Sequence, residues 1–416
     1  MTRDWLILAD DLTGAADCAI AFGRRGRTAA VTWGEVADAS DHQLPVLAYD
    51  AASRGLSAAA AAACHAYLLA RLSGERILFK KIDSTLRGQP AAETTAALAH
   101  LKSRFGAAFG VFAPAFPATG RTTIDGRIFV NGRPLEEAEV WRRDHTYPSA
   151  DLVDVLATAG VRGEKIALAT VRGGDLKAIF ARLASEGDVV AACDAETDHD
   201  LHLIAEASLP ASPATFFIGS AGFAHALAGL DAGDAAEPLR IPARTSGTLI
   251  VVGSLAGASR AAARKLQETG TVMHFPVDPE LLLNNNDAGR AALAADVMKR
   301  IANGGDALVE IMMDDHPDLS LGPKLAQGLA ETLATVAPAI GAFAATGGET
   351  AAALLSRFGV NGIRLADEIE PGVSLGLTLG QLSIPIATKA GAFGDEHSLI
   401  RISERLRAVR TKGSFA

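Results

Sequence analysis

Two adjacent aspartates, Asp10 and Asp11, directly follow the apolar run of residues 5–9. The apolar run predicts a buried strand, and residues 17–22 predict a helix after it. Open α/β sheets bind ligands at the carboxyl edge of their strands, where these two acids would lie. Capping of the helix by one aspartate is the alternative interpretation. Two adjacent acids exceed what one cap requires, so we expect them to act on a ligand.

A loop with five polar or charged residue types, KKIDSTLRG at residues 80–88, follows a second strand candidate. Arg87 can form two parallel hydrogen bonds with a carboxylate, and Lys81 supplies a compact positive charge. Asp83 adds an acid and Ser84 a hydroxyl. This set suits a small, anionic, polyhydroxylated ligand. The alternative is a solvated loop, because the following Gly-Gln-Pro also marks an ordinary helix start.

A third polar loop, PAFPATGRT at residues 114–122, also follows a strand candidate. Two prolines stiffen it, and a glycine allows close approach to a ligand. Arg121 is therefore a candidate for a second contact to an anion, with a surface salt bridge as the alternative. Nearby, Asn131-Gly132 predicts a hairpin turn.

Three glycine-rich turns in the second half each separate a predicted strand from a predicted helix. They occupy residues 253–259, 345–350 and 389–395. Small residues there expose backbone N–H groups at a helix N-terminus, where the partial positive charge favours phosphate. Tight α/β packing explains each turn singly, but three in one half favour a phosphate site. The sequence contains neither a GxxxxGK[ST] motif nor a dinucleotide fingerprint.

The elements that must position these residues alternate between strands and helices. In the first half, strands are predicted at residues 46–49, 76–80, 108–112, 166–168, 189–191 and 215–218, and helices at residues 57–72 and 90–105. In the second half, strands are predicted at residues 248–252, 307–311, 342–345 and 384–388, where Pro385 favours an edge strand or a strand end. The pattern predicts mainly parallel sheets with helices on both faces.

The polar, proline-containing segment between Gly229 and Gly247 indicates a linker. We therefore predict two α/β domains with a cleft between them. The predicted bounds are residues 1–230 for the first domain, 231–247 for the linker and 248–416 for the second domain.

Bulk composition narrows the function classes. With 416 residues and a net charge of −9, the chain suits neither a nucleic-acid scaffold nor an anionic membrane surface. No apolar stretch reaches the ~20 residues of a membrane span. Its cysteines Cys18, Cys64 and Cys193 are widely spaced, and the N-terminus has no signal-peptide pattern. We expect a cytoplasmic protein with a small-molecule ligand, no nucleic-acid or membrane partner, and homo-oligomerisation as an open possibility.

Taken together, these motifs resemble the four-carbon acid sugar kinase family over nearly the whole chain. ADDLTGAAD, KKIDSTLRG, PAFPATGRT and GSAG are similar to the family's substrate-binding domain. GSLAGAS, ATGGET, EPGVSLG and KAGAFGDEHSL are similar to its nucleotide-binding domain. The resemblance implies ATP-dependent phosphorylation, with Mg²⁺, of the terminal hydroxyl of a four-carbon sugar acid. D-threonate or D-erythronate is the expected acceptor, and 3-oxo-tetronate is the alternative.

The resemblance also implies roles for individual residues, with the metal ligands left open. The expected acceptor-site residues are Asp10, Asp11, Lys81, Asp83, Ser84, Arg87 and Arg121, among which Asp11 and Asp83 are the candidate catalytic acids. The expected ATP-site residues are Ser254, Ser259, Gly347, Gly348, Glu349, Thr350, Gly391, Ala392, Phe393 and Gly394. From another class of protein, the rival hypothesis is a non-catalytic sensor that binds the sugar acid without consuming ATP.

Overall fold

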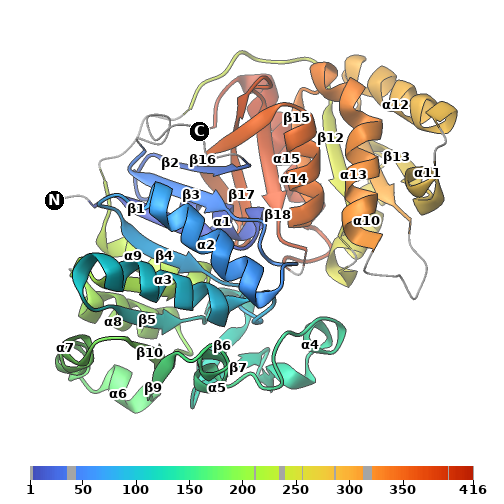
Figure 1. Ribbon diagram of the computed structural model, residues 1–416. Helices are drawn as coiled ribbons and strands as arrows, with labels where there is room; N and C mark the ends of the chain where they lie inside the picture. Colours follow the sequence, from blue (N-terminus) through green and yellow to red (C-terminus); the bar gives the residue numbers. More distant parts are fainter. Residues whose placement is uncertain are drawn as a thin grey trace. The chain divides into compact units, whose positions relative to one another are not determined.

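The chain folds into two compact units, Met1–Ala236 and Glu237–Ala416 (Figure 1). This computed structural model describes residues 3–34, 44–209, 212–233, 239–254, 256–284, 287–312, 321–391 and 393–415. No helix within these ranges is both long and apolar enough to cross a membrane.

Within the described residues, eight parallel strands form the sheet of the first unit, in the order β2-β3-β1-β4-β11-β5-β10-β9. The bounds are β1 Trp5–Ala9, β2 Ala29–Trp33, β3 Val46–Asp50, β4 Ile77–Lys81, β5 Phe109–Ala113, β9 Arg162–Ile166, β10 Val189–Cys193 and β11 Thr215–Gly219. Strands β1, β5 and β10 are apolar throughout because helices cover both faces of the sheet, whereas the central strand β4 ends in Lys80 and Lys81.

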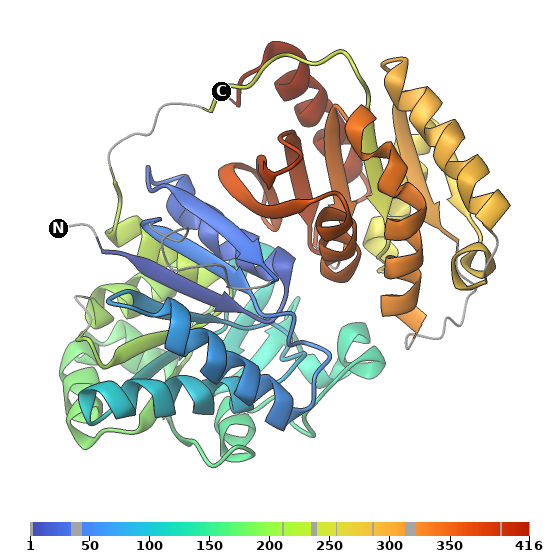
Figure 2. The same ribbon diagram turned by 45° about the horizontal axis from the view of Figure 1, so that its top comes forward.

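Side-chain alternation in β1 shows the two faces. Trp5 packs against Phe22, with ring centroids 4.9 Å apart, on the face covered by α1 and α9. Leu6 and Leu8 belong to the apolar cluster on the opposite face, under α2 and α3 (Figure 2). The helix bounds in this unit are α1 Leu12–Gly23, α2 Ala58–Leu72, α3 Pro90–Phe105, α4 Glu139–Arg143, α5 Leu152–Ala157, α6 Leu168–Arg172, α7 Leu176–Glu186, α8 Asp198–Ser208 and α9 Ala221–Leu230.

A small antiparallel sheet follows β5 and contains β6 (Arg121–Ile124), β7 (Arg127–Val130) and β8 (Arg133–Pro134). Asn131 and Gly132 connect the last two strands with φ angles of 51° and 75°. Positive φ at both positions is the geometry of a type I′ hairpin turn, so the hairpin prediction is confirmed.

The second unit has the strand order β13-β14-β12-β15-β18-β17-β16, of which the first five strands are parallel and the last two form an antiparallel hairpin. Helices α10 and α15 pack on one face, and α13 and α14 pack together on the other. The bounds are β12 Thr248–Val252, α10 Gly257–Glu268, β13 Val272–Val277, α11 Pro279–Leu283, α12 Asp287–Ala302, β14 Asp306–Ile311, α13 Gly322–Leu333, β15 Ala342–Thr346, α14 Gly348–Arg357, β16 Val360–Glu370, β17 Val373–Gly380, β18 Pro385–Lys389 and α15 Ser398–Lys412.

The predicted class, two α/β units with mainly parallel sheets, is confirmed, but two local predictions are wrong. The first helix begins at Leu12 rather than residue 17, because Asp11 caps it. The strand predicted at residues 166–168 ends at Ile166, and a helix begins at Leu168. The prediction for Pro385, an edge strand or a strand end, is confirmed in its second form, because Pro385 is the first residue of β18, a central strand between β15 and β17. A first strand residue can lack its N–H donor without breaking the ladder.

Candidate active site

The acids at residues 10 and 11 lie where the connections of the first sheet change direction. The connection after β1 leads to β2 on one side, and the connection after β4 leads to β5 on the other side. Such a switch point leaves a crevice at the carboxyl ends of the two strands. Asp10 and Asp11 follow β1, and Asp83 follows β4, so both predicted acid positions border this crevice.

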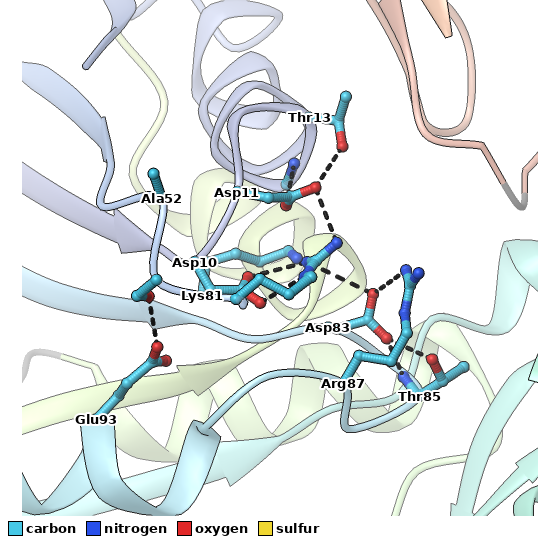
Figure 3. A network of polar contacts seen from close by, with 12 residues as sticks. Asp10, Asp11, Thr13, Ala52, Lys81, Asp83, Thr85, Arg87 and Glu93 are labelled. Atoms are coloured by element: carbon cyan, nitrogen blue, oxygen red, sulfur yellow. Dashed lines mark hydrogen bonds and ion pairs between the residues drawn. The ribbon is translucent and has the colours of Figure 1, made fainter. Parts of the chain in front are cut away.

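Arg54, on the turn after β3, draws the three acids together. Asp10, Asp11 and Asp83 lie close to one another in Figure 3. Its Nε and Nη2 donate to the two carboxylate oxygens of Asp10 at 2.7 and 3.0 Å, and its Nη1 donates to Asp11 Oδ2 at 2.9 Å. Asp83 Oδ2 lies 3.6 Å from Nη2. One guanidinium therefore connects the loops after β1, β3 and β4. The Arg54 side chain keeps 22% of its surface exposed, so a ligand can still reach it.

Arg87 forms the second cation–acid pair. Its Nη2 donates to Asp83 Oδ2 at 2.7 Å, while the backbone N–H of Thr85 donates to Asp83 Oδ1 at 2.9 Å. The Arg87 Nε is buried and has no hydrogen-bond partner among the described residues. Because a guanidinium has five N–H donors, Arg87 can hold Asp83 and still donate to a bound anion.

Lys81 is the third cation, at the end of β4 under the start of α1. A side chain at Gly14 would place its Cβ 2.6 Å from both Lys81 Nζ and Asp11 Oδ1. Gly14 is thus required for the close approach of this ammonium and this carboxylate. Burial opposes the charge of Lys81, but Cys18 and the site's aspartates raise the pKa of this lysine above its ordinary value.

The candidate catalytic acids keep their charge at neutral pH. Burial alone would raise the pKa of Asp11, but Arg54 and Lys81 hold it below its ordinary value. Burial acts in the same way on Asp83, where Arg87 and Arg54 hold the pKa well below its ordinary value. Both side chains are therefore carboxylates that accept hydrogen bonds, and neither is a proton donor.

The remaining predicted acceptor-site residues lie in the same loops. Ser84 is buried between Asp83 and Thr85. Arg121 begins β6, donates to the Thr119 carbonyl oxygen, and is close enough to Asp83 and Arg87 to interact electrostatically with both. Burial lowers the pKa of Arg121. All seven predicted residues thus lie at or just after the carboxyl ends of β1, β4 and β5, with Lys81 as the last residue of β4 and Arg121 as the first residue of β6.

Two residues of this cluster were not predicted. Arg54 is the first, and the second is Asp50, the last residue of β3 and the sheet neighbour of Ala9. Burial, followed by the charge of Asp11, raises the pKa of Asp50 to about 7. Asp50 directly follows the strand predicted at residues 46–49, so the rule that identified Asp10 and Asp11 would have found it, whereas Arg54 lies four residues further along the turn.

Backbone strain in this unit is concentrated beside the two arginines. Five residues other than glycine have positive φ among those described, and three of them are Asp125, Asn131 and Asp188. Asp and Asn tolerate this region, whereas Ala52 (φ 48°) and Leu86 (φ 60°) do so at a cost. Ala52 lies two residues before Arg54, and Leu86 immediately precedes Arg87.

The second unit has a switch point of its own, between β12 and β15. The connection after β12 leads to β13 on one side, and the connection after β15 leads to β16 on the other. The three predicted glycine turns follow β12, β15 and β18, which are neighbours in the sheet. They meet: a Cβ on Gly391 would lie 2.2 Å from Ser254 Oγ, and the Gly347 N–H donates to the Lys389 carbonyl at 3.1 Å.

The helices at these turns begin without side-chain caps. The N-cap residues of α10 and α14 are Ala256 and Gly347, and neither makes a capping hydrogen bond from its side chain. The first N–H groups of each helix are therefore available to an anion. Thr350 and Glu349 lie in the first turn of α14, and a Cβ on Gly253 would lie 2.0 Å from Thr350 Oγ1.

Lys389, the last residue of β18, is the buried cation beneath these turns. Its Nζ donates to Ser259 Oγ at 3.2 Å and to the Ala390 carbonyl at 3.3 Å, and Ser259 Oγ in turn donates to the Gly391 carbonyl at 3.0 Å. Burial lowers the pKa of Lys389 to about 8. Phe393 closes the turn through its N–H to Ala390, Gly394 follows with φ 81°, and predicted Ala392 lies outside the described residues.

Comparisons with known proteins find two family models that match different parts of the chain. Residues 5–227 match the family model of a sugar-binding N-terminal domain, and residues 249–399 match that of a nucleotide-binding C-terminal domain. The chain is 42% identical to a D-threonate kinase of Cupriavidus necator, covering 95% of this chain and 96% of that one. It is 32% identical to a 3-oxo-tetronate kinase of the same organism, covering 93% of each.

A solved structure supports the fold alone. A Salmonella typhimurium LT2 protein described as a putative tRNA synthase superimposes with a TM-score of 0.78 at 22% identity, covering 97% of this chain and 99% of that one. Fold, loops and matched domains together define an α/β enzyme of the kinase class. The chain belongs to the four-carbon acid sugar kinase family.

Proposed function

We propose that this enzyme transfers the γ-phosphoryl group of ATP to the terminal hydroxyl of D-threonate. The observation that carries the substrate choice is the 42% identity, over nearly the full length of both chains, to a kinase named for that acid. D-erythronate, which has the same functional groups, is the second aldonate expected to react. Family membership favours this reaction over a sensor that would bind the acid without consuming ATP.

The acceptor would bind at the switch point of the first unit. Four cations gather there, Arg54, Lys81, Arg87 and Arg121, against the three carboxylates of Asp10, Asp11 and Asp83, while the fourth acid, Asp50, has its pKa raised by burial to about 7 and carries only part of a charge at neutral pH. This excess of positive charge suits a ligand with one carboxylate. Arg87, through its unpaired Nε, and Lys81 would hold the substrate carboxylate. Ser84 would add a hydrogen bond to a substrate hydroxyl.

Asp11 and Asp83 would orient the attacking hydroxyl. In the transfer, an O–P bond forms between the terminal oxygen and Pγ, while the bond from Pγ to the β–γ bridging oxygen breaks and ADP leaves. The hydroxyl proton passes to a carboxylate and then to water. A loose transition state releases this proton late, so a carboxylate with a lowered pKa suffices as acceptor.

ATP would bind at the switch point of the second unit. The turns with Ser254, Gly347 and Gly391 present backbone N–H groups to phosphates, and the charge of Lys389 lies beneath them. Mg²⁺ would neutralise phosphate charge. Among the described residues no group of three His, Cys, Asp or Glu side chains forms a metal site, and we therefore assign no protein ligand to the ion.

A substrate panel tests the proposal. ADP release is measured with D-threonate, D-erythronate, L-threonate and 3-oxo-tetronate, each with ATP and Mg²⁺. We expect the highest kcat/KM with D-threonate. If kcat/KM is highest with 3-oxo-tetronate instead, the proposed substrate is wrong, and the function is that of the 3-oxo-tetronate kinase with 32% identity. Binding of the acids without ADP release would restore the sensor hypothesis.

A further inference from the structure

Four polar side chains are buried directly beneath the turn that carries Arg54. They come from that turn, α2, β4 and α3, and are at most 1% exposed: Ser53, His65, Lys80 and Glu93. Glu93 is the centre of this buried tetrad. Its carboxylate accepts from Ser53 Oγ at 2.6 Å, pairs with Lys80 Nζ at 2.7 Å and lies 3.3 Å from His65 Nε2.

The protonation states of the tetrad follow from its contacts. Burial would raise the pKa of Glu93, but Lys80 and His65 hold it below its ordinary value, so Glu93 is ionised. Burial and the charge of Lys80 lower the pKa of His65, so this ring is neutral. Because the Ser53 hydroxyl donates its hydrogen bond to Glu93, its oxygen is left to accept from His65 Nε2 at 3.1 Å, and we therefore place the ring proton of His65 on Nε2.

Two members of the tetrad are the chain neighbours of acceptor-site cations. Ser53 precedes Arg54, and Lys80 precedes Lys81 on β4. Lys80 Nζ also donates to the Lys81 carbonyl oxygen. Side chains alternate along a strand, so Lys80 points toward Glu93 while Lys81 points toward Gly14 on the other face. The tetrad therefore holds the backbone from which both cations project.

The turn needs such support because its conformation is strained. Ala52 has positive φ, and its N–H donates to Asp50 Oδ1 at 2.7 Å. The Arg54 N–H donates to the Asp10 carbonyl at 3.2 Å. Side chains that fix a strained turn from below are a recurrent means of preorganising a site.

We propose that Glu93 is a positioning residue that sets Arg54 and Lys81 for the acceptor without touching it. The inference rests on the proposed acceptor site at Asp10, Asp11 and Asp83. Ser53→Ala removes one hydrogen bond to Glu93 and adds no atom. We expect kcat/KM for D-threonate to fall about tenfold, which equals one hydrogen bond of about 1.4 kcal/mol, with KM for ATP unchanged. Glu93→Gln should have the larger effect, because it also leaves Lys80 without its buried counter-charge.

A double-mutant cycle separates positioning from general stability. If Ser53 acts through Arg54, the double variant Ser53→Ala/Arg54→Lys loses less kcat/KM than the product of the two single losses. Asp200→Asn is the matched control, because Asp200 is a buried carboxylate on α8 of the same unit. Its two carboxylate oxygens accept from Arg172 Nε at 2.7 Å and from Arg172 Nη2 at 2.8 Å. This control variant should lower the melting temperature and leave the kinetics of the folded enzyme unchanged.

The outcomes distinguish this inference from the proposed function. Unchanged D-threonate kinetics in Ser53→Ala, or losses that multiply in the double variant, overturn the positioning role. If Arg54→Lys and Asp83→Asn also leave D-threonate kinetics unchanged, the acceptor site itself is misplaced. The D-threonate kinetics of Glu93→Gln are a second, independent measurement of the role of the tetrad. If Glu93→Gln does not fold, the kinetics of Ser53→Ala still decide the question.

Discussion

The two units place their candidate site loops at the same topological position, but the residues that form these loops differ in size and charge. At the β1/β4 switch point the loops carry charged side chains, and Asp11 caps α1 with its carboxylate at 3.0 Å from the Gly14 N–H. At the β12/β15 switch point the loops consist of small residues, and α10 and α14 begin without side-chain caps. Strand topology decides where a ligand can bind, and the local residues decide which ligand it is.

This contrast predicts opposite sensitivities. A site made of charged side chains should fail when a charge is removed, whereas a site made of backbone N–H groups should fail when an atom is added. The variants below test this difference, from the largest expected effect to the smallest.

Asp11→Asn removes one charge from the β1/β4 switch point with almost no change in shape. The asparagine carbonyl can still cap α1, so folding should be retained. If Asp11 orients and deprotonates the hydroxyl, kcat should fall roughly 10²–10⁴-fold, the range of general-base catalysis. Steady-state kinetics with D-threonate measure this, and KM for ATP serves as the control. If the variant has the full kcat and only a lowered melting temperature, Asp11 has no catalytic role and serves only as the cap of α1.

Gly391→Ala adds one methyl group at the β12/β15 switch point. Its Cβ would lie 2.2 Å from Ser254 Oγ and 3.1 Å from Ser254 Cβ, so the serine must move. Losing one hydrogen bond to phosphate should raise KM for ATP roughly tenfold. Titration calorimetry with ADP checks the affinity directly. Gly229→Ala is the matched control, since a Cβ there meets no atom within 4 Å and Gly229 lies on α9, outside both switch points. Equal effects of both variants would argue against the turn as a nucleotide contact.

Asp50→Asn tests whether a buried charge at the β1/β4 switch point lowers the free energy of unfolding. The folded pKa of Asp50 is about 7, against 3.8 for an ordinary aspartate. Between these values the native state binds more protons than the unfolded chain, so this group makes stability fall as pH rises from about 4 to 7. Above pH 7 the variant should therefore be more stable by roughly 4 kcal/mol, and the gain should disappear near pH 4. Urea unfolding at both pH values measures it.

Asp200→Asn gives the opposite sign. The pKa of Asp200 is lowered, because Arg172 and backbone N–H groups outweigh the effect of burial. Its stabilisation is present above pH 4 and is lost as pH falls, so the variant should be less stable at neutral pH. A pH-independent gain in Asp50→Asn would contradict the assigned titration.

Much of this arrangement could be predicted from the sequence. Short apolar runs followed by polar or glycine-rich turns correctly marked β1, β4, β12, β15 and β18, and parallel topology then brings their ends together. The hairpin β16–β17 was missed, because its long, mixed-polarity strands lack a continuous apolar run. Strand β9 was misplaced for a related reason: its residues Arg162, Glu164 and Lys165 lie on a polar edge strand.

The contacts that connect elements could not be predicted in the same way. Glu93 lies in the helical run after residue 89, where it resembles any solvent-facing glutamate. Its burial depends on Ser53, which is 40 residues away, and on Lys80. Pairings over such distances are set by the packing of α3 on the sheet, which residue patterns along one segment do not contain.

The strained positions Ala52 and Leu86 have a consequence for how the chain can evolve. Each would be relieved by glycine, which adopts positive φ without penalty. Glycine would also make the turns that present Arg54 and Arg87 more flexible. At these two positions, a substitution that stabilises the fold is therefore expected to order the site less well. Programmes that raise heat resistance by idealising every backbone angle should therefore leave both positions untouched.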